Sequence, residues 1–316
     1  MALQVRAAEE LPFKSTMTDA ERVQEEAQRA RQNAMPDTPG TGRFPAIKEE
    51  IRTPVPQVLY RPANLAALGN TRLGIYVFGN GACVDDGASS RLHLLEIASH
   101  GYLAIAPGRI LNGPGATGPR PPPAATQAPE LNVRSSYKDL LQAIDWAIAQ
   151  NADPKSPYYG RIDTTAIAAS GFSCGGAQAM RVAADPRVKT LVMMNSGLFD
   201  DGASASIPEM DVRKAALKDV KGPVLYVIGG ETDTAFGNAQ DDFSRISHVP
   251  VVLANLQGVG HGGTYWEPNG GKAATTVVSW LEWQLRGDAR SAASFKGRDC
   301  GLCRNKDWTI EKKRVD

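Results

Sequence analysis

Short runs of Val, Ile, Leu and other apolar residues recur along the chain from about residue 55, separated by longer stretches with a helical pattern. Runs of this length and composition are typical of buried strands. They predict strands at 73–78, 102–106, 165–169, 190–194, 224–228 and 251–254. Residues 55–60 form a further candidate strand, and its prolines favour a position at an edge of the sheet.

The stretches between the strands carry apolar residues at helical spacing, most clearly Leu140, Leu141, Ile144 and Ile148. The predicted helices span 89–99, 135–148, 177–184, 212–217, 239–246 and 273–285. Strands separated by helices of this length imply parallel crossovers, so the sequence predicts an α/β fold with a doubly wound, mostly parallel sheet flanked by helices. In such sheets the ligand site lies beyond the carboxyl ends of the strands.

The alternation of strands and helices indicates one domain over 51–298, interrupted by a Pro/Gly-rich loop insertion at 107–131. Residues 1–50 are predicted to form an N-terminal helical extension and linker. A capping box at 18–21 would begin its helix, whose thin apolar stripe makes it surface-docked or marginal. Residues 299–316 are predicted to form a C-terminal tail.

The composition is that of an ordinary globular protein, with 316 residues, of which 42% are hydrophobic and 22% charged. A formal net charge of +1 gives no reason to expect nucleic acid or an anionic membrane as a partner. We expect no membrane span, because no apolar run approaches the length of a transmembrane helix. The first residues are too short for a signal-peptide apolar region, so we expect a cytosolic protein or a mature form whose leader Met1 has replaced.

Cys300 and Cys303 form a C-x-x-C pattern after the last predicted helix. A redox motif would be expected at a helix start near a βαβ unit, and a zinc site would need a second pair of ligands. The favoured interpretation is a local disulfide in a secreted or periplasmic protein whose leader is absent from this chain, with free thiols as the alternative. A cytoplasmic location stays open.

A G-x-S-x-G pattern at 171–175 lies between the strand at 165–169 and the helix at 177–184. Glycine two residues to either side of Ser173 allows the close backbone approach that a sharp strand-to-helix turn requires. Such a turn exposes the Ser173 hydroxyl and places the N–H of Cys174 at a helix N-terminus, where it can face a developing oxyanion. The pattern therefore predicts Ser173 as a nucleophile, and the alternative is an ordinary tight turn.

The chain has four histidines, and only His261 lies in a Gly-rich loop after a late strand. We predict that His261 is the general base, which takes the proton of the serine and returns it to the leaving group. Asp233, which follows the strand at 224–228, is the predicted acid that orients the imidazole. Glu231, Asp200 and Asp201 are its rivals.

An oxyanion hole needs a second backbone N–H, and the Gly-rich loop at 79–83 is suited to supply it. The predicted donor is Gly81 or Ala82, with Ala82 favoured, while the alternative is a plain glycine turn. If this loop lies beside the serine, Cys83 and Cys174 are near neighbours. A disulfide between them would tie the two donors together, and two free buried thiols are the alternative.

These motifs resemble those of the α/β-hydrolase superfamily, specifically its dienelactone-hydrolase and cutinase-like polyester hydrolase branch. The likeness covers roughly 55–298 and includes the chain order Ser, Asp, His. Residues 97–102 are similar to the "ASHGF" segment of those enzymes, 161–163 to their approach to the nucleophile, and 280–290 to their last helix and its exit. The resemblance implies an α/β-hydrolase fold and a secreted serine esterase with no metal or cofactor.

The sequence therefore predicts a serine carboxylic-ester hydrolase that acts through an acyl-enzyme on a small-molecule or polymeric ester. Phe199, Phe236, Tyr265 and Trp266 lie in loops after strands and are candidate walls of the substrate pocket, with packing as their alternative role. The same parts can run amide hydrolysis or acyl transfer. A non-catalytic binding protein on the same scaffold is the alternative from another functional class, and the sequence specifies no oligomeric state.

Overall fold

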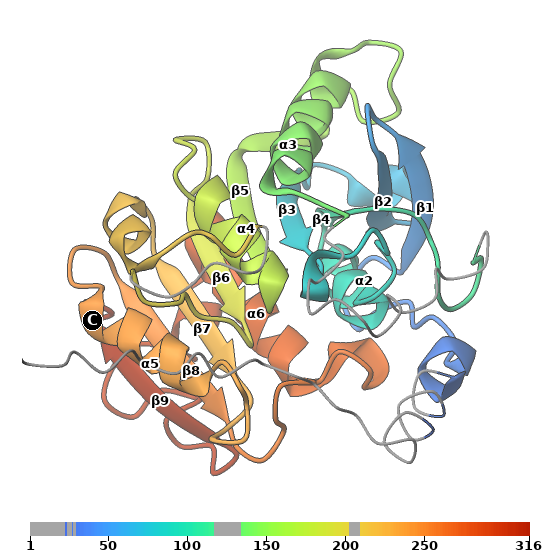
Figure 1. Ribbon diagram of the computed structural model, residues 1–316. Helices are drawn as coiled ribbons and strands as arrows, with labels where there is room; N and C mark the ends of the chain where they lie inside the picture. The colour runs from blue at the N-terminus through green and yellow to red at the C-terminus, as the bar shows by residue number, and fades with distance from the viewer. Residues whose placement is uncertain (1–22, 24–26, 28–29, 117–133, 202–208) are drawn as a thin grey trace, which may run out of the picture.

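The computed structural model of the protein describes residues 23, 27, 30–116, 134–201 and 209–316. In this part of the chain nine strands form one sheet in the order β1-β2-β4-β3-β5-β6-β7-β8-β9 (Figure 1). The strands are β1 (Ala46–Arg52), β2 (Pro56–Pro62), β3 (Leu73–Gly79), β4 (Tyr102–Pro107), β5 (Ile162–Phe172), β6 (Thr190–Met194), β7 (Val224–Ile228), β8 (Val251–Leu256) and β9 (Trp308–Lys313). Neighbours from β4 through β8 are parallel, whereas β1, β2 and β9 run antiparallel to their neighbours. The predicted mostly parallel sheet is confirmed.

Helices cover both faces of this sheet. The helices are α2 (Arg91–Ser99), α3 (Tyr137–Ala152), α4 (Cys174–Val182), α5 (Phe236–Arg245), α6 (Gly271–Arg286) and α7 (Ala289–Ala292). Short 3₁₀ turns are η1 (Leu65–Leu68), η2 (Gly81–Cys83), η3 (Lys214–Asp219) and η4 (Pro268–Gly270). Apolar residues of α3, α4 and α5 pack on one face, and those of α2 and α6 pack on the other. Of the helices described, none is both long and apolar enough to pass through a bilayer.

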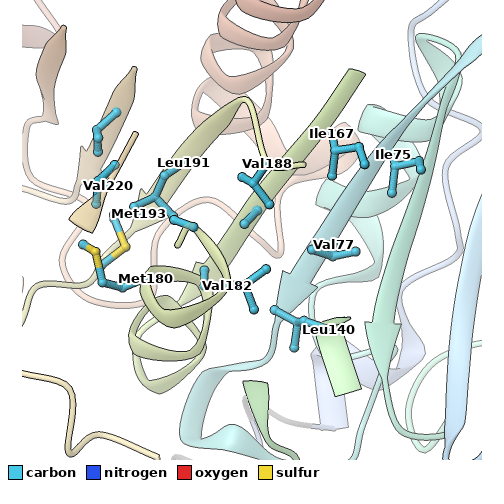
Figure 2. Close-up of a cluster of buried hydrophobic side chains, with 14 of the residues drawn as sticks. Ile75, Val77, Leu140, Ile167, Met180, Val182, Val188, Leu191, Met193 and Val220 are labelled. Atoms are coloured by element: carbon cyan, nitrogen blue, oxygen red, sulfur yellow. The ribbon is translucent and has the colours of Figure 1, made fainter. Parts of the chain in front are cut away.

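Successive side chains along each central strand point to opposite faces of the sheet and so contribute to both layers of the core. On β3, Ile75 and Val77 point into the cluster beneath α3 and α4, where Figure 2 also places Ile167 of β5. Tyr76 and Phe78 point to the opposite face and join the cluster under α2 and α6. Because successive strand residues face opposite sides and both sides are covered, the central strands are apolar throughout. This is why their sequences read as uninterrupted hydrophobic runs.

The two edges of the sheet differ from the sequence-based prediction. β1 pairs with β2, so the strand predicted near 55–60 is not an edge strand. β1 begins at Ala46, inside the predicted N-terminal extension, and β9 forms within the predicted C-terminal tail and pairs with β8. Both edge strands are rich in charged residues, which protect exposed edges from further pairing and hide the apolar signal of a strand.

Two predicted segments lie wholly or largely outside the described residues. These are the capping box at 18–21 with most of the helix after it, and residues 117–131 of the loop insertion. The helix predicted near 212–217 is the 3₁₀ turn η3. The parallel strands β3 to β8 all end at one edge of the sheet, so the loops that follow them share that edge (Figure 1).

Candidate active site

Five loops contribute residues to the carboxyl edge of the parallel strands. Ser173 follows β5, Asn195 follows β6, Asp233 lies in the loop after β7, and His261 lies in the loop after β8. Residues 80–83 follow β3, the central neighbour of β5. This is the edge at which open α/β sheets bind ligands, and it carries the three side chains predicted to be catalytic.

His261 joins the other two predicted catalytic side chains. Its Nε2 lies 3.0 Å from Ser173 Oγ, and its Nδ1 lies 2.7 Å from Asp233 Oδ1. The His261 side chain is 33% exposed, whereas that of Asp233 is fully buried. A neutral imidazole that donates from Nδ1 to the carboxylate presents Nε2 as the acceptor for the serine proton. The arrangement is therefore competent to deprotonate Ser173.

The rival acids lie elsewhere. Glu231 is exposed to solvent. Asp200 faces Arg245 at 3.5 Å, and Asp201 accepts a hydrogen bond from the backbone N–H of Ala215. Of the acids considered from the sequence, Asp233 is the one that contacts the imidazole.

Asp233 accepts four hydrogen bonds within the protein. Oδ1 accepts from His261 and from the backbone N–H of Ala235 at 3.0 Å. Oδ2 accepts from the side-chain amide of Asn195 at 2.7 Å and from the backbone N–H of Gly229 at 3.0 Å. Burial raises the pKa of this carboxyl, but the hydrogen bonds to the ionised form lower it more, so the pKa lies below its ordinary value. Asp233 is therefore ionised at neutral pH.

The turn at Ser173 has the strained geometry that the G-x-S-x-G pattern predicts. Ser173 lies between β5 and α4 and adopts φ 52° and ψ −119°. Residues other than glycine rarely adopt this backbone conformation. A Cβ on Gly171 would lie 2.0 Å from the carbonyl oxygen of Gly175, and one on Gly175 would lie 2.0 Å from that of Gly79. The first contact closes the turn on itself, and the second lets it touch the end of β3. Neither glycine can carry a side chain in this geometry.

Backbone strain gathers at this edge. Seven non-glycine residues in the described part of the chain have positive φ, and four of them are Ala82, Cys83, Ser173 and Asn195. Each such position costs about 1–3 kcal/mol and persists only where the surrounding structure enforces it. Strain of this kind concentrates at active sites, so its clustering makes this edge a candidate functional site on grounds separate from the side-chain chemistry.

The loop after β3 is fixed against the turn at Ser173 by a disulfide. Cys83 and Cys174 are bonded, with their Cα atoms 5.4 Å apart, and Cys300 is bonded to Cys303. Both predicted disulfides are confirmed, and the chain has no free cysteine. The Cys83–Cys174 bond brings the loop after β3 beside the residue that follows Ser173.

The same loop carries the predicted oxyanion donors. Within the described residues, the backbone N–H groups of Gly81, Ala82 and Cys174 have no protein acceptor. The buried Asn80 side chain donates to the carbonyls of Val84 at 2.9 Å and Pro107 at 2.8 Å, and so anchors the start of the loop. Unpaired N–H groups held by a disulfide and a buried amide are suited to stabilise an anionic oxygen.

Phe172, which precedes Ser173, packs against the rings of His261 and Tyr265. The Phe172 ring lies 5.3 Å from the His261 ring and 4.6 Å from the Tyr265 ring, measured between centroids. A Cβ on Gly81 would lie 2.4 Å from the Phe172 ring, so Gly81 lets the loop after β3 rest on it. The position of Phe172 inside the G-x-S-x-G pattern was its only sequence signal.

The four aromatic residues predicted as pocket walls have different surroundings. Tyr265 is only 3% exposed and belongs to the buried cluster under α2 and α6, which agrees with packing, the alternative role that the sequence analysis left open for it. The ring of Trp266 lies 5.6 Å from the guanidinium of Arg91 on α2. Phe199 is half-buried in the loop after β6, and Phe236 is half-buried at the first position of α5, where it packs against the cluster beneath α3 and α4.

Asn195, like Phe172, is a residue of the site that the sequence analysis missed. It is buried and donates to the carboxylate of Asp233. The sequence feature that could have identified Asn195 is its position directly after β6, since the other site residues also follow strands.

Comparison of the sequence with models of known protein families and with curated proteins gives no match. Among the side chains described, no group of three or more His, Cys, Asp or Glu residues is placed to hold a metal ion.

The Cys83–Cys174 disulfide is expected to contribute far more to stability than the Cys300–Cys303 disulfide. The two bonds close loops of 91 and 3 residues, and the loop entropy that they remove corresponds to about 4–5 and about 1.5 kcal/mol. Urea unfolding of the Cys83→Ser/Cys174→Ser and Cys300→Ser/Cys303→Ser double variants measures both losses. Equal losses would contradict the loop-entropy explanation.

Proposed function

We propose that the protein is a serine carboxylic-ester hydrolase of the α/β-hydrolase superfamily, in its dienelactone-hydrolase and cutinase-like branch. The observation that carries the proposal is the continuous contact from Ser173 Oγ through the imidazole of His261 to the buried carboxylate of Asp233. Fold stability does not require this set of three, and it lies at a strained strand-to-helix turn of the kind that α/β-hydrolases use.

In the acylation step, His261 Nε2 takes the Ser173 proton as Oγ bonds to the ester carbonyl carbon. The carbonyl π electrons move to its oxygen, and this anion accepts hydrogen bonds from the N–H groups of Cys174 and Ala82 or Gly81. Collapse of the tetrahedral species breaks the bond to the alcohol oxygen, which receives the proton from His261. The product of this step is an acyl ester on Ser173.

Deacylation follows the same steps, with water as the nucleophile in place of Ser173. His261 takes a proton from water as its oxygen attacks the acyl carbon, and the same N–H groups hold the second oxyanion. Ser173 then leaves and regains its proton from the imidazolium. Asp233 stays ionised throughout, because its hydrogen bonds hold its pKa low, and it stabilises the imidazolium in both steps.

The half-exposed rings of Phe199 and Phe236 are proposed to line the substrate pocket, since both follow strands whose ends carry site residues. The substrate is a small-molecule or polymeric ester. A panel of p-nitrophenyl esters of increasing acyl length, with aromatic esters and a polyester film, would define its acyl part.

Labelling with a fluorophosphonate probe tests the proposal directly. We expect one probe per chain, with the adduct on the peptide that contains Ser173 and a parallel loss of ester hydrolysis. A folded protein that takes no label and hydrolyses no ester would instead be a binding protein on this scaffold. An adduct on another serine would refute the assignment of the nucleophile.

We also propose that the protein works in an oxidising compartment, as a secreted or periplasmic enzyme. The pairing of all four cysteines supports this, since disulfides persist outside the reducing cytosol. Mass spectrometry of a non-reduced digest from the native source tests it, and recovery of all four cysteines as free thiols would contradict it.

A further inference from the structure

Asn195 occupies a strained and buried position at the end of β6. Its φ is 45°, its side chain is almost fully buried, and its backbone N–H donates to the carbonyl of Val227 at 2.7 Å. Left-handed backbone at a non-glycine residue is costly, and Asn tolerates it better than most side chains. This backbone conformation places the Asn195 side chain between the loops after β7 and β8.

The Asn195 amide contacts both of those loops. Nδ2 donates to Asp233 Oδ2 at 2.7 Å and to the carbonyl of Gly260, the residue before His261, at 3.2 Å. Oδ1 lies 3.4 Å from the hydroxyl of Tyr265, which can donate to it. The orientation of the amide is fixed, because a carboxylate and a carbonyl can only accept and therefore both need the NH₂ group.

We propose that Asn195 is a positioning residue for the proposed ester hydrolase, on which this inference rests. By holding Oδ2, it fixes the rotation of the Asp233 carboxylate so that Oδ1 faces the imidazole. By holding the Gly260 carbonyl, it keeps His261 in reach of Ser173. In this role Asn195 acts through Asp233 and His261.

This role predicts a specific kinetic defect in Asn195→Ala. Loss of the amide frees the carboxylate and the loop that carries His261, and displacements of this kind cost about 10- to 100-fold in rate. We expect kcat to fall by that factor while KM for a p-nitrophenyl ester changes less than about threefold, because substrate contacts are untouched. A fall in stability alone would leave kcat of the folded fraction unchanged.

Asn112 offers a matched control elsewhere in the fold. It is also a buried amide that donates to a buried carboxylate, Asp86, at 2.6 Å, and it accepts from Arg91 at 3.0 Å. The carboxylate that contacts His261 is that of Asp233 and not that of Asp86. We expect Asn112→Ala to lower the unfolding midpoint as Asn195→Ala does while keeping kcat within about threefold of the wild type.

A spectroscopic measurement separates the positioning role from the proposed function. The Nδ1 proton of His261, held against Asp233, should give a downfield ¹H NMR signal that broadens or disappears in Asn195→Ala and persists in Asn112→Ala. If the wild type hydrolyses no ester but the signal behaves in this way, the proposed function fails and the positioning role stands. If Asn195→Ala keeps both kcat and the signal, the positioning role is overturned.

Asn195→Asp keeps the test decisive if the alanine variant does not fold. The substitution preserves shape but places a second carboxylate 2.7 Å from that of Asp233, where the native amide donates. Like charges at this distance repel, so we expect a loss of kcat at neutral pH at least as large as in Asn195→Ala. Wild-type kcat in Asn195→Asp would overturn the inference, because a residue that only fills space would tolerate the change.

Discussion

Replacing Ser173 with alanine is expected to lower kcat/KM for ester hydrolysis by about 10⁴- to 10⁶-fold. The change removes the oxygen that lies 3.0 Å from His261 Nε2, so no acyl-enzyme can form on this residue. The backbone donors remain, and they account for the residual rate above that of water. Alanine at φ 52° is no more strained than serine, and we therefore expect the variant to fold. Initial rates on a p-nitrophenyl ester and fluorophosphonate labelling measure the effect.

Ser170 provides the control for this experiment. It lies three residues earlier on β5, and its buried hydroxyl accepts a hydrogen bond from Tyr76 at 2.7 Å. Ser170→Ala therefore removes a buried hydroxyl from the strand that leads to Ser173 without removing a contact of His261, and we expect the rate of this variant to stay within about threefold of the wild type. Retained hydrolysis in Ser173→Ala would mean that another group attacks the ester, and the proposed mechanism would fail.

The central strands could be predicted because both of their faces are covered. β3 and β6 are apolar at nearly every position, and such runs are found only where helices pack on both sides. The edge strands β1 and β9 escaped prediction for the opposite reason. Half of each edge strand meets solvent, so charged residues interrupt the apolar pattern that would have identified it.

The sequence located Ser173, Asp233 and His261 because each follows a strand that was itself predictable. It could not assign Asn195, whose part in the site depends on a contact with a residue 38 positions away in the chain. Nor could it tell that Tyr265 faces the core, because the direction of a loop side chain is set by tertiary packing and not by local pattern. Spacing along a chain locates strand ends, but contacts between loops require coordinates.

Replacing Asp233 with asparagine is expected to lower kcat by about 10⁴-fold at neutral pH. An asparagine has one acceptor oxygen where the carboxylate has two, while both carboxylate oxygens of Asp233 accept hydrogen bonds. If the new NH₂ group faced Asn195 and Gly229, it would lie against two N–H donors. Neither donor can become an acceptor by moving its proton. Facing His261 costs less, because the imidazole can move its proton to Nε2. That tautomer points an N–H at Ser173 and cannot accept the serine proton.

The same substitution also changes how stability depends on pH. The pKa of Asp233 is lower in the folded protein than its usual value of 3.8, so its ionised form contributes stability above about pH 4. This contribution is lost as the pH falls through the lowered folded pKa. The gap in the free energy of unfolding between the wild type and Asp233→Asn should therefore be widest at neutral pH and narrow below pH 4, which urea unfolding at several pH values measures.

Glu231→Gln is the matched control for Asp233→Asn, because Glu231 lies two residues away in the same loop and is exposed. We expect this variant to keep its kcat within about threefold of the wild type, since its side chain is not in contact with the imidazole. Wild-type kcat in Asp233→Asn together with a large loss in Glu231→Gln would transfer the role of the acid to Glu231. That result would require the loop after β7 to rearrange, because in the present fold the carboxylate that holds His261 is the buried one.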